Sequence, residues 1–79
     1  MYTVYVLRCL KNNYRYIGQT NNLNKRLDEH NSGLSKSTKN IRPLVLDYSE
    51  EYATRSKAMK RERFLKSGKG REWLTSINH

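Results

Sequence analysis

Two tyrosines near the start of the chain could share one site. Tyr5 and Tyr16 each lie in a segment rich in β-branched and aromatic residues, and a short polar turn separates the two segments. If these segments pair as a hairpin, the facing strands bring the two phenols near each other across the sheet. Such a pair can belong to an active site, but cross-strand tyrosine pairs are more often packing. The spacing alone leaves both interpretations open.

A second pair of reactive side chains lies on a predicted helix. At about 100° per residue, Leu23, Arg26, Leu27 and His30 share one stripe. The leucines would anchor the helix to the sheet, and Arg26 and His30 would project side by side from the edge of the buried face. A guanidinium can clamp a phosphate and an imidazole can carry protons near neutral pH. The alternative is that Arg26 covers the sheet edge with its stem and His30 is a structural, partly buried histidine.

A single carboxylate lies on the apolar stripe of a later helix. Ala58, Glu62 and Leu65 follow the i, i+4, i+7 rule, so Glu62 should face inward. Most of the neighbouring charges are cationic, and one explanation is therefore an ordinary ion pair. The other is a metal ligand, because Mg²⁺ commonly uses one or two protein carboxylates, several waters and substrate phosphates.

Exposed cations could contact a phosphate backbone. The stretch from Gly68 to Arg71 lacks the Walker spacing, so it is interpreted as a turn between helices. Solvated charge explains each cation about as well as a phosphate contact does. The candidates are Lys36, Lys39, Lys66, Lys69 and Arg71.

The charge balance narrows the class of partner. The 79 residues suffice for one domain, spanning 1–79, and carry 16 Lys+Arg against 7 Asp+Glu, for a net charge of +9. This excess favours a polyanion: nucleic acid, an anionic membrane or an acidic protein. No apolar run is long enough to span a membrane, and no signal peptide is visible, so we expect a cytoplasmic protein without a membrane partner. No obligate protein partner is inferred.

Cysteine usage excludes two kinds of site. Cys9 is the only cysteine in the chain, so no intramolecular disulfide can form. One cysteine and two histidines also make no convincing zinc site. We therefore interpret Cys9 as a small buried packing residue.

The elements that must position these side chains follow from residue periodicity, caps and turn residues. We expect strands at about Thr3–Leu10, Tyr14–Thr20 and Leu44–Tyr48, with Glu50–Tyr52 either extending the last strand or forming its exit. We expect helices at about Leu23–Ser32, Arg55–Lys66 and Arg71–Ile77. Ser67–Gly70 is expected to stop the second helix. The order β-β-α-β-α-α predicts an α+β fold with a small antiparallel three-stranded sheet flanked by helices.

In the order of these elements the chain resembles GIY-YIG nucleases, and particularly the short single-domain bacterial members. Thr3-Val4-Tyr5 stands at the first motif, with Thr3 in place of the family's Gly, and Tyr16-Ile17-Gly18 reproduces the second. Arg26 and the run His30-Asn31-Ser32-Gly33 match the helix of the short members. Ala58 through Lys66 is similar to the family's Glu-bearing helix.

The resemblance implies a Mg²⁺-dependent endonuclease, with Mn²⁺ as a possible substitute. It implies hydrolysis of nucleic-acid phosphodiesters, with DNA as the expected substrate in repair, recombination or structure-specific cleavage. Glu62 would hold the metal, Arg26 would stabilise charge, and Tyr5, Tyr16 and His30 would position or deprotonate the attacking water. The alternatives are a basic nucleic-acid-binding module without turnover and an adaptor that docks on an acidic protein.

Overall fold

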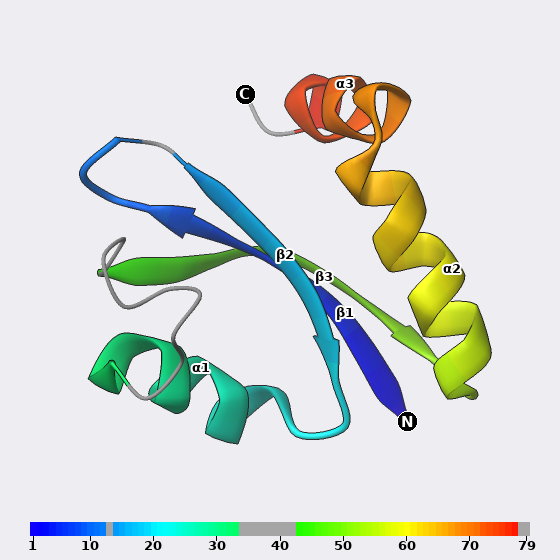
Figure 1. The fold of residues 1–79 in the computed structure, drawn as a ribbon, viewed down its shortest axis with the longest axis horizontal. Helices are drawn as coiled ribbons and strands as arrows, with labels where there is room; N and C mark the ends of the chain where they lie inside the picture. The colour runs from blue at the N-terminus through cyan, green and yellow to red at the C-terminus, as the bar shows by residue number, and fades with distance from the viewer. Residues whose placement is uncertain (13, 34–42, 78–79) are drawn as a thin grey trace.

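The computed structural model describes residues 1–12, 14–33 and 43–77. The elements follow the order expected from the sequence (Figure 1). They are β1 (Tyr2–Cys9), β2 (Arg15–Thr20), α1 (Leu23–Ser32), β3 (Leu44–Tyr52), α2 (Arg55–Lys66) and α3 (Gly68–Ile77). The longest described helix has 12 residues, and none of them could span a bilayer.

The three strands form one antiparallel sheet in the order β2-β1-β3, which confirms the predicted fold class. The central strand β1 is covered on both faces. Leu7 and Cys9 point to the face that carries α1, where Leu44 and the half-buried Leu23 and Leu27 pack against them. This confirms that the two leucines anchor α1.

The opposite face of the sheet carries α2 and α3. Its core is formed by small and branched apolar side chains from the sheet and both helices, namely Val4, Val6, Ile17, Ala58, Leu65 and Leu74. Figure 1 shows α1 on one side of the sheet and the α2–α3 pair on the other. The sheet therefore separates two apolar clusters, and any site that uses both α1 and α2 must lie at an edge of the sheet.

Strand β3 is longer than its apolar run alone predicts. It continues through Glu50 to Tyr52, as the optional extension allowed. The β1–β3 register shifts between Val6 and Leu7, so that Tyr48 and Leu46 face consecutive residues of β1. Tyr48, Glu50 and Tyr52 consequently lie opposite Val6, Val4 and Tyr2, on the face covered by α2 and α3.

Helix α2 ends at Lys66 as expected, but α3 begins at Gly68 and not at Arg71, so the prediction of an interhelix turn from Gly68 to Arg71 was wrong. Ser67 alone separates the two helices: its N–H donates to the Phe64 carbonyl, and its hydroxyl accepts from the Gly70 N–H. A Cβ at Gly70 would lie 2.0 Å from the Phe64 carbonyl oxygen. The glycine is therefore needed for the close approach of two helices and does not end a helix.

Candidate active site

Tyr5 and Tyr16 lie on the face of the hairpin that α1 covers. In the β1–β2 register Tyr5 pairs with Gly18 and Leu7 pairs with Tyr16, so the two tyrosines are diagonal neighbours. Their ring centroids are 6.4 Å apart. A Cβ at Gly18 would lie 2.6 Å from the Tyr5 hydroxyl. The absence of a side chain at Gly18 thus lets the Tyr5 ring extend over the edge strand β2.

Helix α1 brings His30 between the two phenols. The Asn22 side chain caps the helix by accepting from the Lys25 N–H, and Gly33 ends it with a φ of 86°. These signals fix the expected bounds of α1 and turn His30 toward the sheet. The His30 ring is fully buried and lies 5.9 Å from the Tyr5 ring and 4.8 Å from the Tyr16 ring, centroid to centroid.

One buried hydrogen bond joins the Tyr5 hydroxyl to His30 Nε2, at 3.0 Å. Burial raises the pKa of Tyr5, while a hydrogen bond from Arg26 opposes that shift. Burial, reinforced by the Arg26 charge, lowers the pKa of His30. Both groups are consequently held in their neutral forms near pH 7, in which a phenol O–H can donate to an unprotonated imidazole nitrogen.

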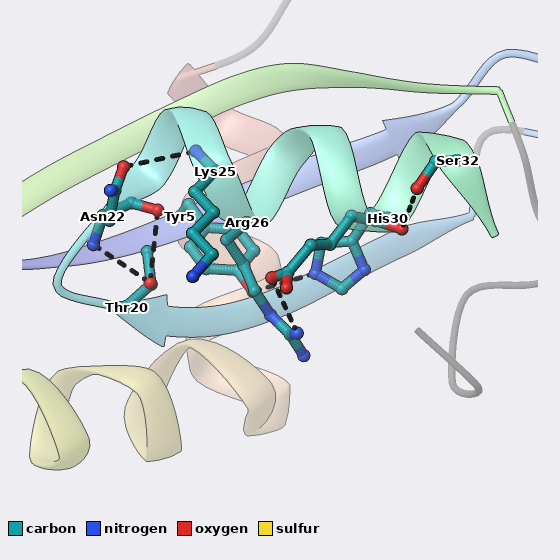
Figure 2. Close-up of polar contacts among 8 residues, drawn as sticks. Tyr5, Thr20, Asn22, Lys25, Arg26, His30 and Ser32 are labelled. Carbon is teal, nitrogen blue, oxygen red and sulfur yellow. Dashed lines mark hydrogen bonds and ion pairs between the residues drawn. The ribbon is translucent and has the colours of Figure 1, made fainter. Parts of the chain in front are cut away.

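Arg26 lies beside this pair and remains partly accessible. Its side chain is 36% exposed and forms an ion pair with Glu29 at 3.4 Å. Hydrogen bonding with the Tyr5 hydroxyl raises the pKa of Arg26. Figure 2 shows the Arg26 side chain running past the Tyr5 ring next to His30. The two α1 residues expected to project side by side therefore share Tyr5 as a common neighbour.

Asn31 attaches the end of α1 to the sheet. Its amide nitrogen donates to the Leu44 carbonyl at 3.0 Å, and its amide oxygen accepts from the Leu44 N–H at 2.8 Å. These two hydrogen bonds resemble the backbone bonds between paired strands. They attach Asn31, the neighbour of His30 in α1, to β3. In the sequence Asn31 was only part of a motif, without a task of its own.

Glu62 lies on α2, which packs on the face of the sheet opposite α1. It is the residue after Arg61 on α2, its side chain is 21% exposed, and it accepts from Lys66 Nζ at 2.7 Å. Burial is the main cause that raises the pKa of Tyr5, and the negative charge of Glu62 adds the smallest contribution in the same direction. Helix α2 packs against both β1 and β2. Glu62 thus interacts electrostatically with Tyr5, while its ion pair matches the simpler of the two sequence interpretations.

The donor set suits one kind of metal. Within residues 1–12, 14–33 and 43–77, no three His, Cys, Asp or Glu side chains are grouped closely enough to hold an ion. The His, Cys, Asp and Glu side chains of those residues therefore form no closed cage of the zinc type. A half-buried single carboxylate fits Mg²⁺, which keeps several waters and takes further oxygens from phosphates.

Three of the five predicted phosphate-binding cations lie on α2 and α3. Lys66, Lys69 and Arg71 are exposed at the junction of the two helices. Lys69 and Arg71 lie in the first turns of α3 and not in a loop. Lys36 and Lys39 lie outside the described residues.

Sequence reasoning missed two features of the site and its surroundings. Gly18 was recognised only as a motif letter, although its register opposite Tyr5 explains it. Glu50 was assigned no role, yet Arg61 binds it through two nitrogens, at 2.9 Å and 3.0 Å. The alternation of Tyr48, Glu50 and Tyr52 places a carboxylate on a buried face, and that was the available signal.

Comparisons with known proteins agree with this arrangement. The chain matches the GIY-YIG catalytic domain over residues 1–75. A UPF0213 protein of Staphylococcus haemolyticus is 40% identical over 75 residues, covering 94% of this chain and 90% of that protein. The UPF0213 protein YazA of Bacillus subtilis is 43% identical over 63 residues, covering 78% of this chain and 63% of that protein.

A solved structure extends the comparison to the fold. The solution NMR structure of a UPF0213 protein from Bacillus halodurans is 31% identical and covers 98% of this chain and 85% of that one, with a TM-score of 0.59. The family match spans both tyrosines, α1 and the Glu-bearing helix. The chain therefore belongs to the GIY-YIG family, whose catalytic domain is of the nuclease type.

Proposed function

We propose that this protein is a Mg²⁺-dependent endonuclease that hydrolyses phosphodiester bonds in DNA. The observation that carries the proposal is the buried hydrogen bond between Tyr5 and His30, with the Arg26 guanidinium beside it. A neutral phenol, a neutral imidazole and a fixed cation in one place are suited to moving a proton next to a phosphate. The family's nuclease-type domain and the net charge of +9 support a nucleic-acid substrate.

The proton transfer uses Tyr5 and His30 together. The raised pKa of Tyr5 argues against a free tyrosinate that would act alone as the base. His30, whose pKa is lowered, is available to accept a proton at Nε2. As the attacking water gives its proton to the Tyr5 oxygen, the Tyr5 proton passes to His30. Neither group then has to hold a charge before the reaction begins.

Charge stabilisation falls to Arg26, and orientation to Tyr16. The partly exposed guanidinium can contact a non-bridging phosphate oxygen as negative charge develops there. Tyr16, whose ring packs edge-on against His30, can hydrogen-bond the same phosphate or the water. Glu62 would hold Mg²⁺, which when bound supplies Lewis-acid polarisation of the phosphate. Mn²⁺ would be the expected substitute.

Binding of the backbone is assigned to cations outside the catalytic group. Lys66, Lys69 and Arg71 are exposed on α2 and α3, and Lys36 and Lys39 are added from the sequence. Such contacts fix the position of the strand without reading its sequence. A cytoplasmic role in DNA repair or recombination is consistent with this activity.

Glu62→Ala tests the proposed activity. Incubated with Mg²⁺ and labelled duplex, flap, junction and single-stranded DNA, the purified wild type should cleave at least one substrate. The variant should lose cleavage but retain DNA binding, because the other cations remain. Glu72→Ala, which removes an exposed carboxylate from α3, serves as the control and should cleave normally. Full activity of Glu62→Ala would refute the metal assignment.

The ion pair between Glu62 and Lys66 favours a second candidate, a nucleic-acid-binding module without turnover. In that case Lys66 would stay paired with the Glu62 carboxylate, and added Mg²⁺ would not displace it. Binding without a cleaved product, in preparations free of host nucleases and across the substrate panel, would identify this alternative.

A further inference from the structure

A cluster of polar and aromatic groups lies on the face of the sheet away from Tyr5 and His30. At its centre Glu50 of β3 has a side chain that is only 16% exposed. It accepts hydrogen bonds from both Tyr48 and Tyr52 on its own strand, and from Nε and a terminal nitrogen of Arg61 on α2. Burial alone would raise the pKa of Glu50, but these bonds outweigh it and the pKa is lowered. The carboxylate therefore stays charged and bound to α2.

Arg61 is also held by stacking. Its guanidinium carbon lies 4.9 Å from the centroid of the Phe64 ring and 4.7 Å from that of Trp73 on α3. Trp73 in turn packs edge-on against Tyr48, with centroids 5.5 Å apart. One arginine thus connects β3, α2 and α3 through a planar fork whose bidentate geometry permits little rotation.

The apolar contacts of α2 constrain its rotation less. Its buried side chains are Ala58 and Leu65, one small and one flexible. Hydrophobic burial is not directional, so these contacts hold α2 on the sheet without aiming a particular polar side chain beside them. A helix with side chains has a radius of about 5–6 Å, so a rotation of roughly 20° moves a side-chain end by about 2 Å. Functional groups must be held to within about 0.5 Å.

Glu62 directly follows Arg61 on α2, about 100° around the helix. We propose that Glu50 is a positioning residue for the metal-binding carboxylate: by clamping Arg61 it fixes the rotation of α2 and directs Glu62 toward the Tyr5 side of the sheet. This inference rests on the proposed role of Glu62. Glu50 itself touches neither the substrate nor the ion, and it acts only through Arg61 and the helix.

The test measures metal binding without DNA and without turnover. Mn²⁺ is titrated into the full-length protein, and paramagnetic broadening of the Tyr5 and Tyr16 ring signals is followed by NMR. Glu50→Gln removes the charge with little change of shape. Arg61→Lys keeps the charge but removes the fork and the stacking, so it separates positioning from simple charge pairing.

The matched control is Asp47→Asn. Asp47 lies on the same strand and pairs with Arg8 of β1 at 3.5 Å, so its loss removes an ion pair between β3 and β1. We expect the half-saturating Mn²⁺ concentration to rise about 10- to 100-fold in Glu50→Gln and Arg61→Lys, as losses of supporting residues around metal sites typically cause. The half-saturating Mn²⁺ concentration of Asp47→Asn should stay within about twofold of the wild-type value. We expect this even if Asp47→Asn lowers the stability of the protein as much as Glu50→Gln does.

Four outcomes would overturn the inference. An unchanged half-saturating Mn²⁺ concentration in Glu50→Gln would show that α2 needs no clamp. The wild-type value in Arg61→Lys would show that the contact with Glu50 is charge pairing alone. An equal loss in Asp47→Asn would mean that general destabilisation explains the effect. A Glu62→Gln control that still broadens both tyrosines would instead refute the metal assignment itself, and the inference would fall with it.

Discussion

At the scale of single residues, the buried Tyr5–His30 pair is defined by two opposite pKa shifts. Burial raises the pKa of the phenol and lowers that of the imidazole. Each shift favours the uncharged form, because an ion is costly to bury. A histidine that ordinarily titrates at 6.5 therefore stays neutral to a lower pH in the folded chain.

Acid should destabilise the protein through His30. Its folded pKa lies below the unfolded value of 6.5, so the unfolded chain binds the proton first. Stability should be complete above pH 6.5 and fall as the pH drops from there through the lowered pKa. Urea unfolding between pH 7.5 and 5 measures this, and His30→Gln should flatten the curve in that window. Glu50, whose pKa is lowered from 4.5, acts only at more acidic pH. A wild-type curve as flat as that of His30→Gln would contradict the assignment.

A methyl group at Gly18 should disturb the site more than the fold. The added Cβ would lie 2.6 Å from the Tyr5 hydroxyl, which is the end of a side chain and can shift. Such a shift breaks the 3.0 Å bond to His30. We expect Gly18→Ala to lower DNA cleavage about 100-fold, as loss of general acid–base catalysis does.

Gln19→Ala, at the next position of β2, is the control for Gly18→Ala and should cleave normally. Cleavage rates of the wild type and both variants are measured at saturating Mg²⁺. Equal rates for Gly18→Ala and the wild type would mean that the Tyr5–His30 contact is not required.

At the scale of elements, the junction of α2 and α3 depends on backbone proximity. The ideal Cβ at Gly70 would lie 2.5 Å from the Leu65 Cα, while nothing lies within 4 Å of one at Gly68. The atoms nearest to a Cβ at Gly70, in Phe64 and Leu65, all belong to the α2 backbone and not to a movable side-chain end. Helix α3 as a whole would therefore have to shift. Two glycines that are two residues apart therefore have opposite tolerances.

Alanine at the two positions should separate these effects. Gly70→Ala should reduce the free energy of unfolding by about 1–3 kcal/mol, the usual cost of overpacking. Gly68→Ala should raise it by up to about 1 kcal/mol, because alanine restricts the unfolded chain. Urea denaturation of both variants gives the comparison. Equal stabilities would show that α3 can move away from α2 without cost.

The same junction shows where prediction from sequence ended. The bounds of α1 and α2 were predictable, because Asn22, Thr54 and Gly33 are local capping signals. The start of α3 was not: two glycines normally indicate a break, and only the close contact of Gly70 with the α2 backbone shows why a glycine lies inside the helix. The five proposed site residues followed from periodicity and the family resemblance. For the contact between Glu50 and Arg61, the alternation along β3 indicates a buried carboxylate, but no local pattern identifies its partner on α2.

At the scale of the whole molecule, the excess of cations sets how binding should respond to salt. A protein that neutralises phosphates releases counterions, so the logarithm of its affinity falls with the logarithm of the salt concentration by about 0.9 per contact on duplex DNA. Lys69→Gln should therefore reduce the slope by about 0.9 if this cation contacts a phosphate.

Lys11→Gln, an exposed cation at the hairpin turn, is the matched control and should leave the slope unchanged. Fluorescence anisotropy with labelled duplex DNA at several salt concentrations measures both slopes. Identical slopes in Lys69→Gln and the wild type would remove Lys69 from the binding surface.

The position of β1 between β2 and β3 has a consequence for how the molecule assembles. Tyr5, Tyr16, Arg26 and His30 lie within the continuous segment of β1, β2 and α1, but the end of α1 is attached to β3 by the Asn31–Leu44 hydrogen bonds. Glu62 lies on α2, after β3 in the chain, and β3 pairs with β1 from a distant part of the sequence, which costs more chain entropy than the β1–β2 hairpin and is slower to form. The α1 residues and Glu62 therefore both depend on the pairing of β3 with β1, and only a chain folded through α2 carries all five groups.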